Sequence, residues 1–194
     1  MADQHIIFSK DQIRTFTKTF TMYNTVIIGL PFIIMWGSEM FEQVKGIVNL
    51  LLTDGVLAYL WEFTKMYFWI MLGLLSGIIL HELIHALTFL LITGKGLKAV
   101  EFGFIEKPLI PYVHFKEQIS VRAYRIGTAM PGILLGIIPS IAGLWSGSGY
   151  FLLFGIVFIS AAAGDFLVIR ATKGIDPRLK VRDLPDEIGF EVVG

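Results

Sequence analysis

The sequence predicts an all-α membrane protein: a bundle of about four transmembrane helices with a short cytoplasmic β-hairpin or loop between spans two and three. Of the 194 residues, 55% are hydrophobic and only 16% are charged. The mean hydropathy is +0.70, which is typical of membrane proteins. Four stretches carry at most one charge each and have 18 or more residues, against the ~20 that cross a bilayer: residues 20–37, 66–92, 126–145 and 150–169. We therefore expect a single membrane-embedded domain over residues 1–194.

The first helix is expected to begin before its span. Ser9 followed by Gln12 matches a capping box, which places the start of the helix near Lys10. Pro31 is expected to kink the span. Residues 37–65 then carry apolar side chains at helical spacing, interrupted by polar ones. Two interpretations stay open for this segment: an interfacial or re-entrant amphipathic helix, or the outer end of a long helix packed on the bundle.

The segments further along the chain differ in amino-acid composition. Residues 100–119 are rich in aromatic and aliphatic residues and are broken by prolines, which predicts a β-hairpin or an irregular loop on the membrane face. Pro131 and Pro139 are expected to kink the third span. After Arg170 the chain is polar, and the apolar residues within 188–193 could form one strand.

The basic residues predict the orientation. Fourteen of the 16 precede the first span, lie between spans two and three, or follow the fourth, while only Lys45 and Lys65 fall on the other side. Because cytoplasmic loops are enriched in Lys and Arg, we expect both termini to be cytoplasmic. The formal net charge of zero suggests no nucleic-acid partner. The absence of cysteine excludes disulfides and thiolate metal ligands.

The second span carries the most informative motif, His81-Glu82-Leu83-Ile84-His85, in which Glu82 is the only formal charge of the span. Helical residues i and i+4 lie about 40° apart around the axis, so both imidazoles could ligate one Zn²⁺. Glu82 lies about 60° from His85, close enough to reach a water on that metal but outside the ligand row. The alternative is that the two histidines and Glu82 are core residues whose polar groups find their partners on neighbouring helices. Ionisable groups at this depth are costly without a partner, which favours the metal.

A catalytic zinc usually takes three protein ligands, and Asp165 is the candidate for the third. It is the only charged residue of the fourth span. Counted from the expected inner ends of their spans, Asp165 and His85 lie at similar depths of ~7 and ~10 Å. A stripe of glycines leads into the histidines and favours close helix packing. The alternative for Asp165 is a bond to the backbone or to Arg170, and His114 is a weaker candidate for a ligand or substrate contact.

The arrangement of these motifs resembles the site-2 protease type of intramembrane zinc metalloprotease. More closely, it resembles a family of small bacterial multi-pass membrane proteins classed as zincin peptidases. The resemblance covers roughly residues 66–193 and is carried by His81–His85, His114–Glu117, Met130–Gly132 and Gly164-Asp165. Site-2 proteases usually carry Asp followed by Gly, whereas here Gly precedes Asp165. The resemblance implies a multi-pass protein of the bacterial cytoplasmic membrane.

We therefore expect a zinc-dependent intramembrane metallopeptidase that hydrolyses peptide bonds of membrane-associated substrates. His81, His85 and Asp165 would hold Zn²⁺, and Glu82 would activate a zinc-bound water and later protonate the leaving amine. The expected partners are the lipid bilayer and a membrane protein or peptide substrate. The alternative is a non-catalytic metal- or substrate-binding membrane protein of zincin-like architecture, which the intact Glu82 disfavours. A metal transporter is less favoured because the other spans offer no further charged ligands.

Overall fold

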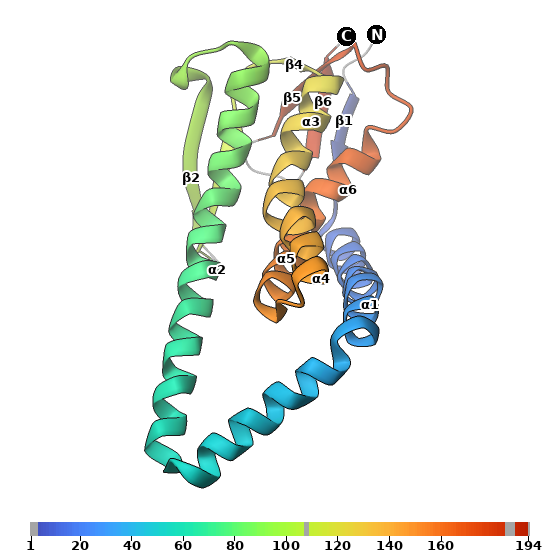
Figure 1. Ribbon diagram of the computed structural model, residues 1–194. Helices are drawn as coiled ribbons and strands as arrows, with labels where there is room; N and C mark the ends of the chain where they lie inside the picture. The colour runs from blue at the N-terminus through green and yellow to red at the C-terminus, as the bar shows by residue number, and fades with distance from the viewer. Residues whose placement is uncertain (1–3, 107–108, 185–188, 194) are drawn as a thin grey trace.

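The computed structural model describes residues 4–106, 109–184 and 189–193 (Figure 1). Three of its helices are long and apolar enough to cross a membrane, or four when a bent pair is counted as one span. This agrees with the four expected spans. The all-α prediction is wrong in one respect, because a four-stranded sheet accompanies the hairpin. The two termini lie together at one end of the molecule, beside this sheet (Figure 1).

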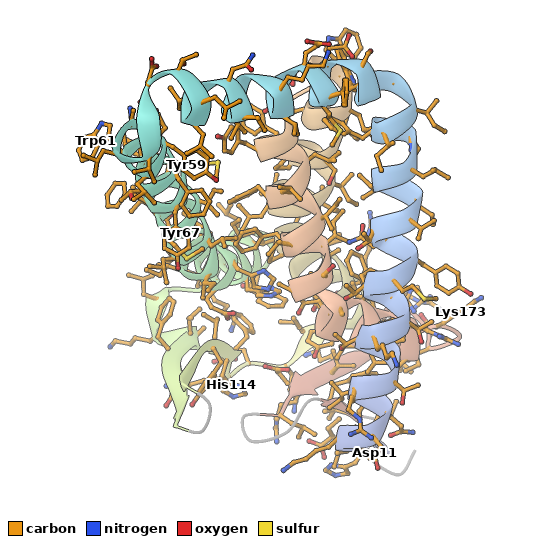
Figure 2. All side chains as sticks on the ribbon, turned by 90° about the horizontal axis from the view of Figure 1, so that it is seen from below. Asp11, Tyr59, Trp61, Tyr67, His114 and Lys173 are labelled. Atoms are coloured by element: carbon orange, nitrogen blue, oxygen red, sulfur yellow. The ribbon has the colours of Figure 1, made fainter. Side chains whose placement is uncertain are left out.

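The first helix, α1 (Lys10–Thr53), begins where the capping box predicts. The backbone N–H of Ser9 donates to Gln12 Oε1 at 2.8 Å, and the backbone N–H of Gln12 donates to Ser9 Oγ at 3.3 Å. Pro31 lies inside the helix, which continues through it. Figures 1 and 2 both show α1 changing direction near its middle, so that its second half crosses toward the next helix.

Residues 37–65 do not form a separate amphipathic helix. They are the second half of α1 and the first turns of α2 (Gly55–Thr93), which meet at Gly55, where φ is +84°. The interpretation as the end of a long helix is therefore right about continuity. It is wrong about packing, because large side chains there stay exposed, with Phe41 at 61% and Leu57 at 80%.

The third span is one continuous helical run. It consists of α3 (Val121–Pro131), a π-helical segment η2 (Gly132–Ile137) and α4 (Ile138–Ser146). The irregularity expected from proline takes the form of the π segment, which follows directly after Pro131, because proline has no N–H to donate. Pro139 lies in the first turn of α4, where a missing N–H is tolerated.

The fourth span, expected over residues 150–169, is not one continuous helix. It is divided into α5 (Gly149–Ala161) and α6 (Ala163–Ala171), which are bent by 46°. Just before the break, Ser160 Oγ donates to the carbonyl of Ile156 at 2.8 Å, a back-bond that often bends helices. As a consequence Asp165 lies in the first turn of α6, where the helix dipole favours a negative charge.

The buried side-chain amide of Asn24 joins α1 to α5 through hydrogen bonds. Asn24 is 8% exposed, and its Nδ2 donates to the carbonyl of Ile156 and to Ser160 Oγ, both at 3.0 Å. A buried amide is costly unless it is hydrogen-bonded. These bonds therefore fix how α1 lies against the fourth span, close to the break.

Glycines allow the closest of the helix contacts. A Cβ on Gly136 of η2 would lie 2.9 Å from the backbone nitrogen of Ile159, so η2 and α5 touch backbone to backbone. A Cβ on Gly77 of α2 would lie 2.2 Å from the ring of Phe158. Gly164 has no atom within 4 Å of such a Cβ. The glycine stripe of α2 thus brings α2 onto α5 through Phe158.

The expected hairpin is present as β2 (Val100–Glu106) and β3 (Leu109–Phe115), which pair antiparallel. At its base, the N–H of Lys116 donates to the carbonyl of Ala99 at 2.9 Å. Ala99 and Lys116 are therefore a hydrogen-bonded pair. Antiparallel partners alternate between hydrogen-bonded and non-hydrogen-bonded pairs. Phe102 and Val113, which face each other three positions further along the hairpin, therefore form a non-hydrogen-bonded pair. Their N–H groups therefore point away from each other, one toward each free edge of the hairpin.

The four-stranded sheet is antiparallel and has the order β1-β6-β5-β4. Its strands are β1 (Gln4–Ile7), β4 (Ile119–Ser120), β5 (Lys180–Asp183) and β6 (Gly189–Val193). Only β6 was expected, and Ile188 of that expectation lies outside the described residues. Val181 and Phe190 are fully buried, so the sheet closes the core at this end of the molecule.

An aromatic cluster joins the sheet to the helices. Phe89 of α2 lies 5.3 Å from Phe115 of β3 and 6.2 Å from Tyr124 of α3, and Tyr124 lies 5.7 Å from Phe190 of β6, measured between ring centroids. Buried aromatic pairs contribute about 0.5–1.5 kcal/mol beyond their area. The cluster therefore holds α2, the hairpin, α3 and the sheet in one fixed arrangement around the site described next.

Candidate metal centre

The two histidines of the second span point the same way, as their spacing predicts. Their ring centroids lie 4.9 Å apart on α2. Both side chains are largely enclosed, with 12% of His81 and 11% of His85 exposed. Two imidazoles are therefore presented to one small volume on the inner side of α2.

Asp165 lies directly against both rings. Its Oδ2 is 3.2 Å from His81 Nε2, and its Oδ1 is 3.4 Å from His85 Nε2. Arg170, the alternative partner for this carboxylate, lies instead over the ring of Phe16, 6.0 Å from its centroid. Within the described ranges, these three side chains form the one group of three or more that could hold a metal ion.

The separations in this group suit zinc. Two ligand atoms that each lie ~2.05 Å from a tetrahedral Zn²⁺ are about 3.3 Å apart. The two separations between Asp165 and the histidines, 3.2 Å through Oδ2 and 3.4 Å through Oδ1, lie close to that value, and one ligand atom from each of the three residues lies within 4.8 Å of the other two. Two imidazole nitrogens and one carboxylate also form a usual donor set for catalytic zinc, which leaves the fourth position open. His81, His85 and Asp165 therefore fit the ion in both chemistry and spacing.

The backbone of α3 orients one of the imidazoles. His85 Nδ1 donates to the carbonyl of Gly127 at 3.0 Å, so Nε2 is left with its lone pair for a metal. A Cβ on Gly127 would lie 2.1 Å from the ring of Phe89, which itself stacks on His85. Gly127 was not among the predicted site residues, because the helical pattern does not show which residue of α3 lies opposite His85.

Glu82 lies beside the three metal-ligand candidates without belonging to their group, as its offset around the helix predicts. The backbone N–H of Val113 points at its carboxylate. This is the N–H that the hairpin register directs away from β2. The free edge of β3 therefore runs along the side of the site where Glu82 lies.

All four residues line one cavity of about 320 Å³. Another part of its wall comes from β3, α3 and β5, with Tyr112, His114, Tyr124 and Asp183 among its lining residues. His114 is labelled on the hairpin in Figure 2. The cavity thus brings the weaker histidine candidate into the same space as the metal-ligand candidates.

A second polar cluster lies in this wall. His114 Nδ1 donates to Asp183 Oδ2 at 3.2 Å, and the hydroxyl of Tyr124 donates to Asp183 Oδ1 at 3.0 Å. His114 is therefore paired with an aspartate of its own, and it is not part of the metal-binding group. Asp183 and Tyr124 were not among the predicted site residues, because no local spacing connects β5 with α3.

Comparison with known proteins identifies one family. A family described as "Putative zincin peptidase" matches residues 74–172, just over half of the chain, and the match includes α2 from before the histidines, the hairpin, α3, α5 and α6. No curated protein and no solved structure matches the chain.

Proposed function

The chain belongs to the family described as "Putative zincin peptidase", and on this premise we propose that it is a zinc-dependent peptidase embedded in a membrane. The observation that carries the proposal is the spacing of His81, His85 and Asp165, which suits a tetrahedral zinc. These three residues would hold the ion. The ion would supply Lewis-acid chemistry, polarising the scissile carbonyl and making water more acidic.

Glu82 is the general base of the proposed reaction. It lies in the cavity beside the three ligand candidates, and its carboxylate takes a proton from the attacking water. The same carboxylate then passes a proton to the leaving amine. The N–H of Val113 points at this carboxylate.

The free edge of β3 is the proposed binding site for the substrate chain. An extended peptide adds to an exposed strand edge through main-chain hydrogen bonds, and this edge borders Glu82. A peptide paired there would pass along the cavity with its backbone extended, which is the form that a peptidase must present to its general base.

The membrane location rests on the helices. Three of them, or four with the bent pair, are long and apolar enough to cross a bilayer, and the site residues lie within two of these segments. The proposed substrate is therefore a membrane-associated protein or peptide, cleaved in the manner of site-2 proteases. The distribution of basic residues supports an orientation with both termini in the cytoplasm.

Exchange of Glu82 for glutamine tests the proposal. In detergent, the purified wild type should carry one zinc per chain and cleave members of a fluorescence-quenched peptide library. Glu82→Gln should retain the zinc and lose hydrolysis by ~10²-fold or more, as expected when a general base is removed. Glu62→Gln is the matched control, because Glu62 lies on the same helix in an exposed ion pair with Lys65. Zinc binding without hydrolysis by the wild type would instead indicate a non-catalytic metal-binding protein.

A further inference from the structure

Three basic side chains gather where the third span begins and the fourth span ends. Arg125 comes from α3, Arg170 from the last turn of α6, and Lys173 from the turn that follows α6. Together with Ile169 and Gly174 they line a groove of about 340 Å³. Figure 2 shows Lys173 at the periphery of the molecule, and none of these five residues lines the cavity of the metal centre. The groove is therefore a separate feature of the molecule, with three positive charges among its lining residues.

The fold holds Arg125 in place at this groove. Its Nε donates to Thr172 Oγ1 at 2.7 Å, and its Nη2 donates to the carbonyl groups of Thr172 and Ile175. Thr172 is fully buried and caps the C-terminal end of α6. Within the part of the chain that the structure describes, Nη1 of Arg125 has no hydrogen-bond partner, so it remains for a ligand. Because the guanidinium is already ordered, a ligand that binds it costs little additional side-chain entropy.

The end of α6 brings the other two cations to the groove. The N–H of Lys173 donates to the carbonyl of Arg170 at 3.1 Å. Gly174 follows with φ at +89°, a left-handed conformation that glycine adopts without strain. Arg170 lies over the ring of Phe16, 6.0 Å from its centroid. The turn therefore keeps Lys173 beside the last turn of the helix, while the contact with α1 limits the freedom of Arg170.

No carboxylate of residues 4–106, 109–184 or 189–193 forms an ion pair with any of these three cations. Asp176, the acid nearest in sequence, is bound by Arg178 at 3.0 Å. Asp11 borders an adjoining groove that shares Arg170, but its carboxylate is bound by Arg14 at 3.0 Å. Like charges that line one groove repel one another, so the groove favours an anionic ligand.

The place of the groove in the fold identifies the kind of anion. Both helices that form it belong to segments long and apolar enough to cross a membrane, and the groove lies where these segments begin or end. A bilayer presents its lipid phosphates at this level, where helix ends meet water. Ile169 adds an apolar side chain to the groove, next to which the glycerol and the first methylenes of a lipid could pack. A lipid head group fits this combination of charge and apolar surface.

Resting on the membrane location proposed above, and not on the peptidase chemistry, we propose that Arg125, Arg170 and Lys173 bind the phosphate of an anionic phospholipid. The lipid belongs to the leaflet on the side of the two termini. The guanidinium groups donate to phosphate oxygens, and the ammonium of Lys173 adds a point charge. Asp165 lies in the first turn of α6 and Arg170 in its last turn. The bound lipid therefore also steadies the short helix that carries Asp165.

Lipid binding in detergent tests the site without reference to catalysis. The probe is dioleoylphosphatidylglycerol. Its control is dioleoylphosphatidylcholine, which has the same acyl chains and a phosphate but no net charge. The wild type should retain one molecule of the probe in native mass spectrometry and unfold at a higher temperature with the probe than with the control lipid. Arg170→Gln and Lys173→Gln should each weaken binding about five-fold, the equivalent of ~1 kcal/mol per basic residue near an anionic surface, and the double variant about 25-fold.

Lys98→Gln is the matched control for Lys173→Gln. Lys98 is exposed on η1 (Leu97–Ala99), outside the groove, and its loss changes the net charge by the same amount. This control should bind the probe as the wild type does. Equal losses in Lys98→Gln and Lys173→Gln would show that overall charge attracts the lipid, and this result would overturn the proposal. Arg125 is left unchanged because it also holds the end of α6.

Two further measurements separate the possible sources of an anion and the premises of the proposal. Inorganic phosphate at the concentration of the probe should neither raise the thermal midpoint nor displace the lipid. Displacement would assign the groove to free anions and overturn the lipid site. Equal retention of both lipids by a wild type that binds zinc and cleaves peptides would overturn the lipid site and leave the peptidase in place. A protein that stays monodisperse without detergent would instead contradict the membrane location, and the lipid site with it.

Discussion

Gly127 shows what a single residue contributes to this site. Its carbonyl accepts the hydrogen bond that orients His85, and its lack of a side chain makes room for the ring of Phe89. The spacing of His81 and His85 was enough to predict that both point the same way. The orienting partner could not be predicted, because it depends on how α2 and α3 pack.

Gly127→Ala should therefore destabilise the protein and weaken zinc binding. In an exposed helix, alanine would be favoured over glycine by about 1 kcal/mol. Here the new Cβ would lie 2.1 Å from the ring of Phe89, and overpacking of this kind typically costs about 1–3 kcal/mol. Thermal unfolding in detergent and zinc titration should both show the loss.

Gly29→Ala is the matched control for this substitution. Gly29 lies within α1, and no atom lies within 4 Å of the position of a Cβ there. The control should be neutral or slightly stabilising. If both variants have the same thermal midpoint and zinc affinity as the wild type, Gly127 does not position His85.

At the scale of elements, the break in the fourth span is the feature that sequence analysis missed and that the site most requires. Asp165 was identified because it is the only charge in its span. The bend of 46° between α5 and α6 was not predicted, because no proline marks it and the signal is limited to small residues and Ser160. The break places Asp165 in the first turn of α6, facing both histidines.

The hairpin supplies a prediction at the same scale. Val113→Pro should leave the ladder with β2 intact, because the N–H of Val113 points away from β2. It removes the N–H that points at Glu82 and one donor of the β3 edge, so turnover should fall about tenfold, the equivalent of one hydrogen bond of ~1.4 kcal/mol. Steady-state kinetics with zinc content as a control would measure this.

Phe102→Pro is the matched control on the opposite strand. Phe102 faces Val113 across the hairpin, and its N–H points to the other free edge, away from the site. Its turnover should stay near that of the wild type. A larger loss in Phe102→Pro than in Val113→Pro would show that the substrate chain does not bind along β3.

For the molecule as a whole, the features that could be predicted from the sequence were mostly those of the long apolar stretches. Composition and charge spacing predicted the spans, and a segment rich in aromatic and aliphatic residues and broken by prolines predicted the hairpin or loop. The sheet was largely missed because its strands have only two to five residues, and its pairing joins the first residues of the chain to the last. The outer parts of α1 and α2 were ambiguous because apolar residues at helical spacing suit a bilayer surface, a bilayer interior and a protein contact equally.

The spatial grouping of the ligands depends on the whole fold, since α2 and α6 must meet at the cavity. The most direct test of this grouping is the zinc affinity of Asp165→Asn and Asp183→Asn, measured in detergent by competition with a chromophoric chelator. Both aspartates line the same cavity, but only Asp165 lies against the two histidines. Asp165→Asn should weaken zinc binding by more than the ~10- to 100-fold that is typical of losing an outer-shell partner, whereas Asp183→Asn should bind zinc much as the wild type does. Unchanged affinity in Asp165→Asn, or loss of zinc in Asp183→Asn instead, would contradict the assignment of His81, His85 and Asp165 as the metal centre.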